Sequence, residues 1–207
     1  MIRRPTQGMK MKALSRGALL AFSLASVPQF GFAASPAPLT PPREDLPPSE
    51  PEVAPRGRHA PRDINYSQWR KLCFKAPGKE ALCRTTITGT WATGQMAIRL
   101  DLIEREGASR LQILLPVGLY LQAGVKLRLD TTSGEIRLPY SWCFSNVCVA
   151  AAPIDRKGIR ALGEARAISV EVLDTNLLTL TATIPADQFA SAHSGAPAEV
   201  FEQIIEE

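Results

Sequence analysis

The chain has 207 residues, a formal net charge of +4 and 45% hydrophobic residues, which is typical of one globular domain or two small ones. Five basic residues and no acidic residue lie in residues 1–33. Removing those five from the 24 lysines and arginines leaves 19 basic against 20 acidic side chains, a net charge of −1. This balance argues against a nucleic-acid partner, because such partners require a basic surface.

Residues 1–33 have the three parts of a secretory signal peptide. Basic residues up to Arg16 precede an apolar stretch from Gly17 to Val27, and small residues follow up to Ala33. We therefore predict export, with cleavage after Ala33 or Ala34. The apolar stretch is shorter than the about 20 residues that cross a bilayer. Membrane association is expected only through an uncleaved leader or through a partner protein.

Residues 34–62 are rich in proline and charged residues and poor in apolar ones. Such a segment cannot bury enough apolar surface to offset the entropy lost on ordering. We predict a disordered, proline-rich tether that holds the rest of the chain away from a surface. The folded domain is then expected to span residues 63–207.

Short stretches of alternating apolar and polar residues run through this predicted domain. They predict strands over residues 69–74, 82–88, 96–103, 111–115, 125–129, 136–140, 168–172 and 178–184. Residues 153–165 and 185–192 predict short helices, and 198–207 places its apolar residues on one face of a helical turn. Many short strands separated by turn signals predict an all-β fold, a mostly antiparallel β-sandwich or flattened barrel with short helical pieces.

The four cysteines all follow the predicted leader, which favours disulfides over free thiols. Four cysteines allow three pairings. We predict Cys73 with Cys83 and Cys143 with Cys148, because each pair is local and encloses turn-forming residues. The alternative is a four-cysteine zinc site, which is less favoured because structural zinc sites use shorter spacings than those within these pairs.

The most distinctive pattern lies in residues 115–150. It contains Leu115-Pro116-x-Gly118, Gly124, Asp130, Pro139-Tyr140 and Cys143-x4-Cys148 followed by Ala150, and Trp69-x3-Cys73 and Cys83 precede it. This order resembles the signature of the invasion-associated locus B family of small exported bacterial proteins, over residues 69–189. Lys71 departs from the resemblance, because an apolar residue is expected between Trp69 and Cys73. The resemblance implies a periplasmic, outer-membrane associated or secreted protein, a candidate host-cell invasion or adhesion factor, and no established chemistry.

The residues outside this pattern offer little to catalysis. His193 is the single histidine of the predicted domain and is expected in a loop without a partner, whereas His59 lies in the predicted tether. The motifs of common hydrolases and nucleotide-binding proteins are missing from the sequence. Asp101, Glu104 and Glu106 alternate with arginines, which predicts a solvated surface of compensating charges. We predict no catalytic residue, no cofactor and no metal site.

Function is therefore expected in binding, with a host-cell surface or a protein of the bacterial envelope as partner. The candidate binding surface consists of the side chains around the second cysteine pair: Tyr140, Trp142, Phe144, Ser145 and Asn146. Trp91 and Tyr120 would join Tyr140 and Trp142 in a carbohydrate or peptide groove only if all four were exposed together, and packing is the commoner role of aromatic residues. The alternatives are a periplasmic ligand-binding or chaperone-like envelope module and an uncharacterised enzyme.

Overall fold

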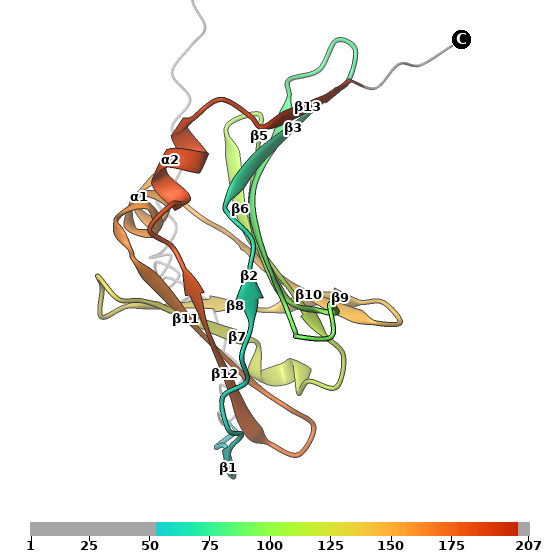
Figure 1. Ribbon diagram of the computed structural model, residues 1–207, viewed down its shortest axis with the longest axis vertical. Coiled ribbons are helices and arrows are strands. Elements are labelled where there is room, and N and C mark those ends of the chain that lie inside the picture. The colour runs from blue at the N-terminus through green and yellow to red at the C-terminus, as the bar shows by residue number, and fades with distance from the viewer. Residues whose placement is uncertain (1–52, 203–207) are drawn as a thin grey trace, which may run out of the picture. The chain divides into compact units, whose positions relative to one another are not determined.

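Two β-sheets face each other across a hydrophobic core, and two short helices lie at one end of it (Figure 1). The computed structural model describes residues 53–202, which fall within the unit Ser49–Glu207. The predicted signal peptide, its cleavage site and residues 34–52 of the predicted tether lie outside the described residues. The two mostly antiparallel sheets confirm the all-β class and decide for the sandwich rather than the barrel.

The smaller sheet contains five strands. Their order is β1 (Gly57–Arg58), β12 (Leu178–Pro185), β11 (Ala167–Leu173), β7 (Val125–Leu129) and β8 (Glu135–Leu138). All neighbours are antiparallel except β1, which runs parallel to β12. The β7–β8 and β11–β12 pairs are the two hairpins that the alternation of residues 125–140 and 168–184 predicts.

The larger sheet contains eight strands. Their order is β13 (Glu199–Glu202), β3 (Arg70–Lys75), β4 (Leu82–Thr90), β5 (Met96–Arg105), β6 (Ala108–Pro116), β10 (Val147–Pro153) and β9 (Tyr140–Cys143), and β2 (Asn65–Tyr66) pairs with the end of β4. Only β13 and β3 are parallel among these pairs of described strands.

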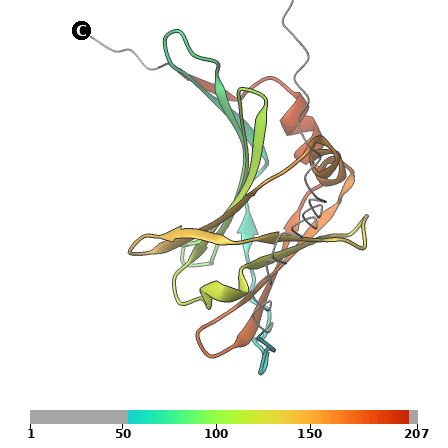
Figure 2. The ribbon, with the colours of Figure 1, turned by 180° about the vertical axis from the view of Figure 1, so that it is seen from behind.

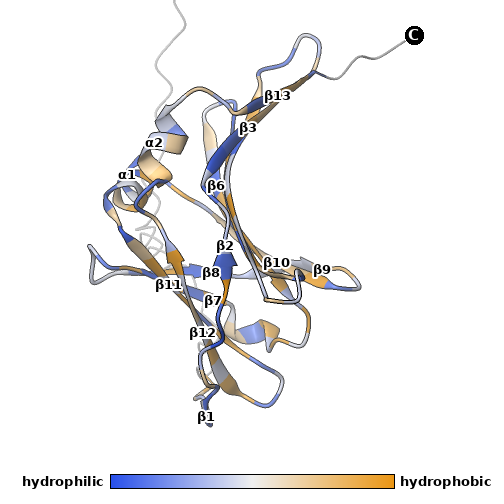
Figure 3. Ribbon diagram, in the orientation of Figure 1, coloured by the Kyte–Doolittle hydropathy of each residue, from blue (hydrophilic) through white to orange (hydrophobic). Residues whose placement is uncertain are grey.

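The core follows from the alternation of side chains along the strands. In β7, Val125, Leu127 and Leu129 are buried while the intervening side chains face outward, and in β5 Leu100 and Leu102 are buried in the same way. Figure 3 shows hydrophobic segments along β11 and β12, whereas β1 and β2 are hydrophilic. The sandwich is therefore held by its inner faces. Strand β1 is attached mainly through its backbone, whereas the Tyr66 side chain of β2 also packs against the core.

The two helices lie at one end of the core, where α2 packs beside β3 and β4 and α1 packs against α2. Helix α1 (Arg156–Glu164) begins at Asp155, whose carboxylate accepts a hydrogen bond from the Gly158 N–H at 2.7 Å. Helix α2 (Phe189–Ser194) buries Phe189 edge-on against Trp69, with ring centroids 5.0 Å apart. The Trp69 indole N–H donates at 2.7 Å to the carbonyl of Pro185, the last residue of β12, so the start of β3 is fixed to the segment that leads into α2.

The chain changes sheets at Pro139. The predicted strand over residues 136–140 is in fact two strands, β8 in the smaller sheet and β9 in the larger one, and Figure 2 shows this run passing from one sheet to the other. Proline has no backbone N–H, so it suits the point where one ladder ends and another begins. Its carbonyl accepts a hydrogen bond from the Ala151 N–H at 3.0 Å, which ties the corner to β10.

The two terminal segments differ from the sequence-based expectation. Residues 199–202, predicted as part of a helical turn, form β13, because the free edge of β3 offers backbone partners and Phe201 stacks on Phe74 at 5.0 Å. The predicted tether up to Arg62 contains β1. There the N–H groups of Arg56 and His59 donate to the carbonyls of Leu177 and Thr179 at 2.8 and 2.9 Å, so apolar side chains are not needed for pairing.

Candidate functional site

The β9–β10 hairpin projects from the larger sheet on the side away from the helices (Figures 1 and 2). Its turn, residues 144–146, is closed by the Phe144 N–H, which donates to the Val147 carbonyl at 2.7 Å. Cys143 and Cys148 lie directly opposite each other and form one of the two predicted disulfides, and Cys73 and Cys83 form the other between β3 and β4. The turn is thus held by a covalent bond at its base.

Two large aromatic side chains of this hairpin are exposed. Phe144 has 62% of its surface exposed at the turn, and Trp142 has 46% exposed on the outer face of the sheet, opposite Val149. Arg110 on β6 supports this end, because its guanidinium lies 5.8 Å from the Trp142 ring centre and donates to the Ser141 hydroxyl at 3.2 Å. The result is a fixed aromatic surface with one cation beside it.

Four of the five predicted surface residues are exposed together, and the fifth is not. Trp142, Phe144, Ser145 and Asn146 are all exposed, while Tyr140 is half-buried against the core. The Tyr140 hydroxyl is buried and has no hydrogen-bond partner among residues 53–202. Its burial raises the pKa of Tyr140 well above the ordinary value of 10.0. Tyr140 therefore supports the hairpin from inside, and it also lines the shallow groove beside Trp142.

A shallow groove of about 300 Å³ adjoins the aromatic surface. It lies between Trp142 and the 3-10 turn η1 (Leu121–Ala123), and the half-exposed Leu121 side chain forms its apolar wall. Sequence reasoning did not find Leu121, because η1 is distant in sequence and only the switch of sheets at Pro139 brings β9 beside it. We use the name aromatic hairpin surface for Trp142, Phe144, Ser145, Asn146 and Leu121.

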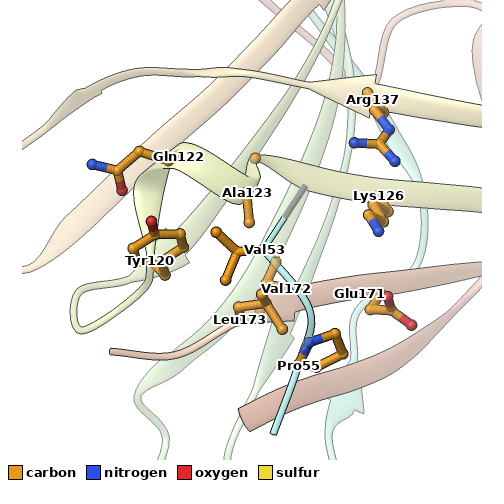
Figure 4. A pocket seen from close by; sticks show the side chains of 11 residues that line it. Val53, Pro55, Tyr120, Gln122, Ala123, Lys126, Arg137, Glu171, Val172 and Leu173 are labelled. Atoms are coloured by element: carbon orange, nitrogen blue, oxygen red, sulfur yellow. The ribbon is translucent and has the colours of Figure 1, made fainter. Parts of the chain in front are cut away.

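The four aromatic residues that would line a common groove do not meet. Trp91 lies at the opening between the two sheets, and Tyr120 lines a separate groove on the outer face of the smaller sheet. The second groove has a volume of about 500 Å³. Figure 4 shows Tyr120 toward one end of it, Lys126, Arg137 and Glu171 toward the other, and Val53 and Pro55 between them. Lys126 and Arg137 are cationic and Glu171 is anionic, so this groove carries charges of both signs. The Glu171 carboxylate also lies 3.7 Å from the Arg128 guanidinium.

His193 is not the partnerless loop residue that the sequence predicts. It lies in the last turn of α2, stacks on Phe189 at 5.5 Å and approaches the Glu104 carboxylate at 3.0 Å. Lys71, the departure from the family pattern, donates to the His193 carbonyl at 2.9 Å at the C-terminal end of the helix, where a cation is favourable. Both residues hold α2 against the sheet, and no nucleophile is placed beside the imidazole in the contacts described.

Asp101 is not part of a solvated surface either. Its side chain is 1% exposed, accepts hydrogen bonds from the Thr86 hydroxyl and from Arg99 Nε at 2.9 Å, and lies 3.8 Å from Arg84 Nε. Asp101 lies on the outer face of β5, where the side chains of Thr86, Arg99 and Arg84 cover it. Arg105 and Glu106, 3.1 Å apart and both exposed at the turn of the hairpin, do fit the prediction of compensating surface charges.

Comparison with known proteins assigns the chain to a family. The model of the family "Invasion associated locus B (IalB) protein" matches residues 69–197, which include both disulfides, the aromatic hairpin surface and both helices. The chain belongs to the IalB family. The resemblance that residues 69–189 carry is thereby confirmed.

Proteins of Brucella and Bartonella are among those to which the chain is similar. Invasion protein B homologs of Brucella abortus, from strain 2308 and from biovar 1 strain 9-941, are each 29% identical over 106 residues. These matches cover 51% of this chain and 61% of each relative's length. The crystal structure of invasion associated protein B from Bartonella henselae superposes with a TM-score of 0.55 at 15% identity, covering 62% of this chain and 90% of that one, which shows a shared fold.

The IalB pattern in this chain consists of residues that build the turns and corners of the sandwich. Gly124 starts β7 with φ of +65°, and a side chain there would come within 3.0 Å of the Leu138 carbonyl. Asp130 accepts a hydrogen bond from the Arg166 N–H at 3.0 Å and links the β7–β8 turn to β11. Pro139 marks the change of sheets. These roles are structural, so the pattern identifies the fold more directly than an activity.

Two further observations concern metals and membranes. Within residues 53–202, no group of three or more histidine, cysteine, aspartate or glutamate side chains is arranged to hold a metal ion. None of the helices described is long and apolar enough to cross a membrane.

Proposed function

We propose that this IalB family member is an exported protein of the bacterial envelope that acts by binding, and that the aromatic hairpin surface is its contact surface. The observation that carries the proposal is the joint exposure of Trp142 and Phe144 on a turn closed by a disulfide. Soluble proteins usually bury side chains of this size, and an exposed group of them marks an interaction surface.

The arrangement suits binding for an energetic reason. Aromatic residues with few rotatable bonds supply much of the energy of protein interfaces. The disulfide and the Phe144–Val147 hydrogen bond already restrain the turn, so little conformational entropy remains to be lost on association. Arg110, stacked on Trp142, adds a cation that favours a partner with acidic groups at the rim.

The proposed partner is a protein on the host-cell surface, with a protein of the bacterial envelope as the second candidate. The first follows from the family, whose name and whose Brucella and Bartonella members' names refer to invasion. Those names mention no reaction, and His193 and Asp101 both serve the packing of the fold. Binding therefore accounts for the surface better than catalysis does.

The test measures binding of the purified, fluorescently labelled chain to cultured human epithelial cells by flow cytometry. Replacing Trp142 and Phe144 together by serine should lower the bound fraction at least tenfold, because each removes a large exposed contact worth about 1 kcal/mol or more. The same chains should be measured on outer-membrane vesicles of the source bacterium, which distinguishes a host partner from an envelope partner.

The control is Phe201→Ser, which removes an aromatic side chain of similar exposure, 44%, at the opposite end of the larger sheet. It should bind like the unmodified chain. Circular dichroism should show that all variants are folded. The hairpin would not be the contact surface if the double Trp142 and Phe144 variant bound cells as well as the unmodified chain did. The same conclusion would follow if the Phe201 variant lost as much binding as the double variant.

A further inference from the structure

A cavity of about 330 Å³ opens into the space between the two sheets, away from the aromatic hairpin surface. Its floor is formed by inward-facing residues of both sheets, among them Ile98 and Leu115 from the larger sheet and Val170 and Leu180 from the smaller one. Protein interiors are normally packed without spaces larger than a water molecule. A largely apolar cleft of this size, open at the edge of the sandwich, has the properties of a ligand pocket.

Small residues and one connecting segment create the space. Ala182 lies on β12 beside Val170, at a position where a larger side chain would fill the gap between the sheets. Residues 59–64, here called the strap, run from β1 on the smaller sheet to β2 on the larger one and border the opening, as Figure 1 shows. Gly89 permits this route, because a Cβ atom there would lie 2.5 Å from Ile64 and 2.7 Å from Tyr66.

The opening carries charged groups of two kinds. The Asp174 carboxylate already has partners within the chain. It accepts hydrogen bonds from His59 Nε2 and from the N–H groups of Asn176 and Leu178, each at 2.8 Å. The Arg62 guanidinium lies 5.8 Å from the Trp91 ring centre, and no acidic side chain of residues 53–202 forms an ion pair with it. The exposed Arg62 donors are therefore available at the edge of an apolar cavity.

We propose that this cavity binds the alkyl chain of a small single-chain carboxylate, a free fatty acid of medium length, with the carboxylate at Arg62. The volume equals that of about eleven water molecules at about 30 Å³ each, which suits a chain of about eight to ten carbon atoms. Burial of the chain against Ile98, Leu115 and Val170 supplies the affinity, and the guanidinium selects the anionic head. The proposal does not depend on the hairpin as a contact surface.

The test is isothermal titration calorimetry of the full chain with decanoate below its micelle concentration, with 1-decanol as the neutral comparison. One decanoate should bind per chain. Arg62→Gln should weaken decanoate about tenfold, the effect of one charge-assisted hydrogen bond, and change decanol less than twofold. Ala182→Phe should abolish binding of both, while Thr183→Phe, the next residue on the opposite face of β12, should leave both unchanged.

A second measurement serves if the Ala182 variant does not fold. Methyl groups of Val170, Leu180 and Leu115 in the unmodified chain should shift in NMR spectra on addition of decanoate, while that of Val117, at the exposed rim, should shift less. Equal binding by the Ala182 and Thr183 variants, or unshifted core methyl groups, would overturn the proposal. So would sedimentation with phosphatidylglycerol vesicles in the absence of any decanoate binding, which would indicate a membrane surface instead.

Discussion

Asp101 was predicted to be solvated, but its side chain is buried. Its place in β5 puts it on the outer face of the sheet, and the surrounding acidic and basic residues in the sequence predict a solvated surface. Burial comes from residues on the neighbouring strand β4, where Thr86 and Arg84 reach over it. The local sequence does not show which strand lies beside β5 or in which register. The contacts of Asp101 with Thr86 and Arg84 were therefore not predictable.

Replacing Asp101 should destabilise the fold strongly. Asp101→Ala removes the acceptor for Thr86 and the partner for Arg99 inside the sheet, and loss of one member of a buried ion pair costs about 3–5 kcal/mol. Thr86→Val, which removes only the hydroxyl donor, should cost about 1–2 kcal/mol. The free energy of unfolding from guanidinium titration measures both. Glu106→Ala, at an exposed ion pair, is the matched control and should change stability by less than about 0.5 kcal/mol.

His59 should make stability depend on pH through Asp174. The hydrogen bond from His59, with those from Leu178 and Asn176, lowers the pKa of the Asp174 carboxyl below its ordinary value of 3.8. A lowered pKa in the folded state contributes stability that is complete above about pH 4 and is lost as the pH falls through the lowered pKa. His59→Ala should therefore lower the guanidinium midpoint clearly at pH 5 and much less at pH 3.

The comparison needs one reference variant. Asp174→Asn has no carboxyl to titrate, so adding His59→Ala to it should have an effect that differs little between the two pH values. If His59→Ala alone lowered the guanidinium midpoint equally at pH 5 and pH 3, the contact between His59 and Asp174 would not be the source of the pH dependence.

At the scale of single elements, strands with clear alternation were predictable and elements set by neighbours were not. Strands β3 to β8, β11 and β12 lie close to their predicted ranges, because each buries one face and therefore shows a period of two. Strand β9 shares only Tyr140 with the predicted strand 136–140, and β10 was not predicted, because residues 148–151 are all buried and do not alternate. Strand β13 was missed, since the apolar side chains of residues 200–205 also fit a helical turn and its four described residues are exposed. Its pairing comes from the free edge of β3, a partner more than 120 residues away in the sequence.

Both disulfides cross hairpins between directly opposed residues, and their removal should destabilise the chain by amounts that follow loop length. In the chain-entropy model, opening the Cys143–Cys148 loop costs about 2 kcal/mol and opening the longer Cys73–Cys83 loop about 3 kcal/mol. Paired replacements by alanine, compared by guanidinium titration, measure each. A larger loss from the shorter loop would show that packing around Cys148, which is buried, outweighs the restraint on the unfolded chain.

At the scale of the whole molecule, the sequence predicts the sandwich but misplaces the point where the ordered part begins. Composition alone marks residues 34–62 as unable to form a core, yet residues 57–64 tie the two sheets together through backbone pairing, His59 and Ile64. Backbone hydrogen bonding has no signature in composition. The same reason hides the cavity, because its walls come from four strands whose mutual distance only the folded chain sets.

Two truncations should separate the strap from the residues before it. A chain that starts at residue 53 keeps β1 and its contacts and should unfold at the same guanidinium concentration as the full chain. A chain that starts at residue 63 loses the two backbone hydrogen bonds of Arg56 and His59 and should be less stable by about 2 kcal/mol or more, at about 1 kcal/mol each. Equal midpoints for the two truncated chains would mean that the strap adds nothing to stability.

The placement of β1 and β13 also constrains when the fold can be completed. β1 pairs with β12, and β13 pairs with β3, so each sheet receives an outer strand from the opposite end of the described sequence. The hairpins from β3 to β6 can form as soon as they emerge from a ribosome. The outer strands β1 and β13 can pair only after β12 and β13, near the end of the chain, have been synthesised. A nascent chain leaves the ribosome with its N-terminus first and consequently keeps these margins of the two sheets unpaired until synthesis is nearly complete.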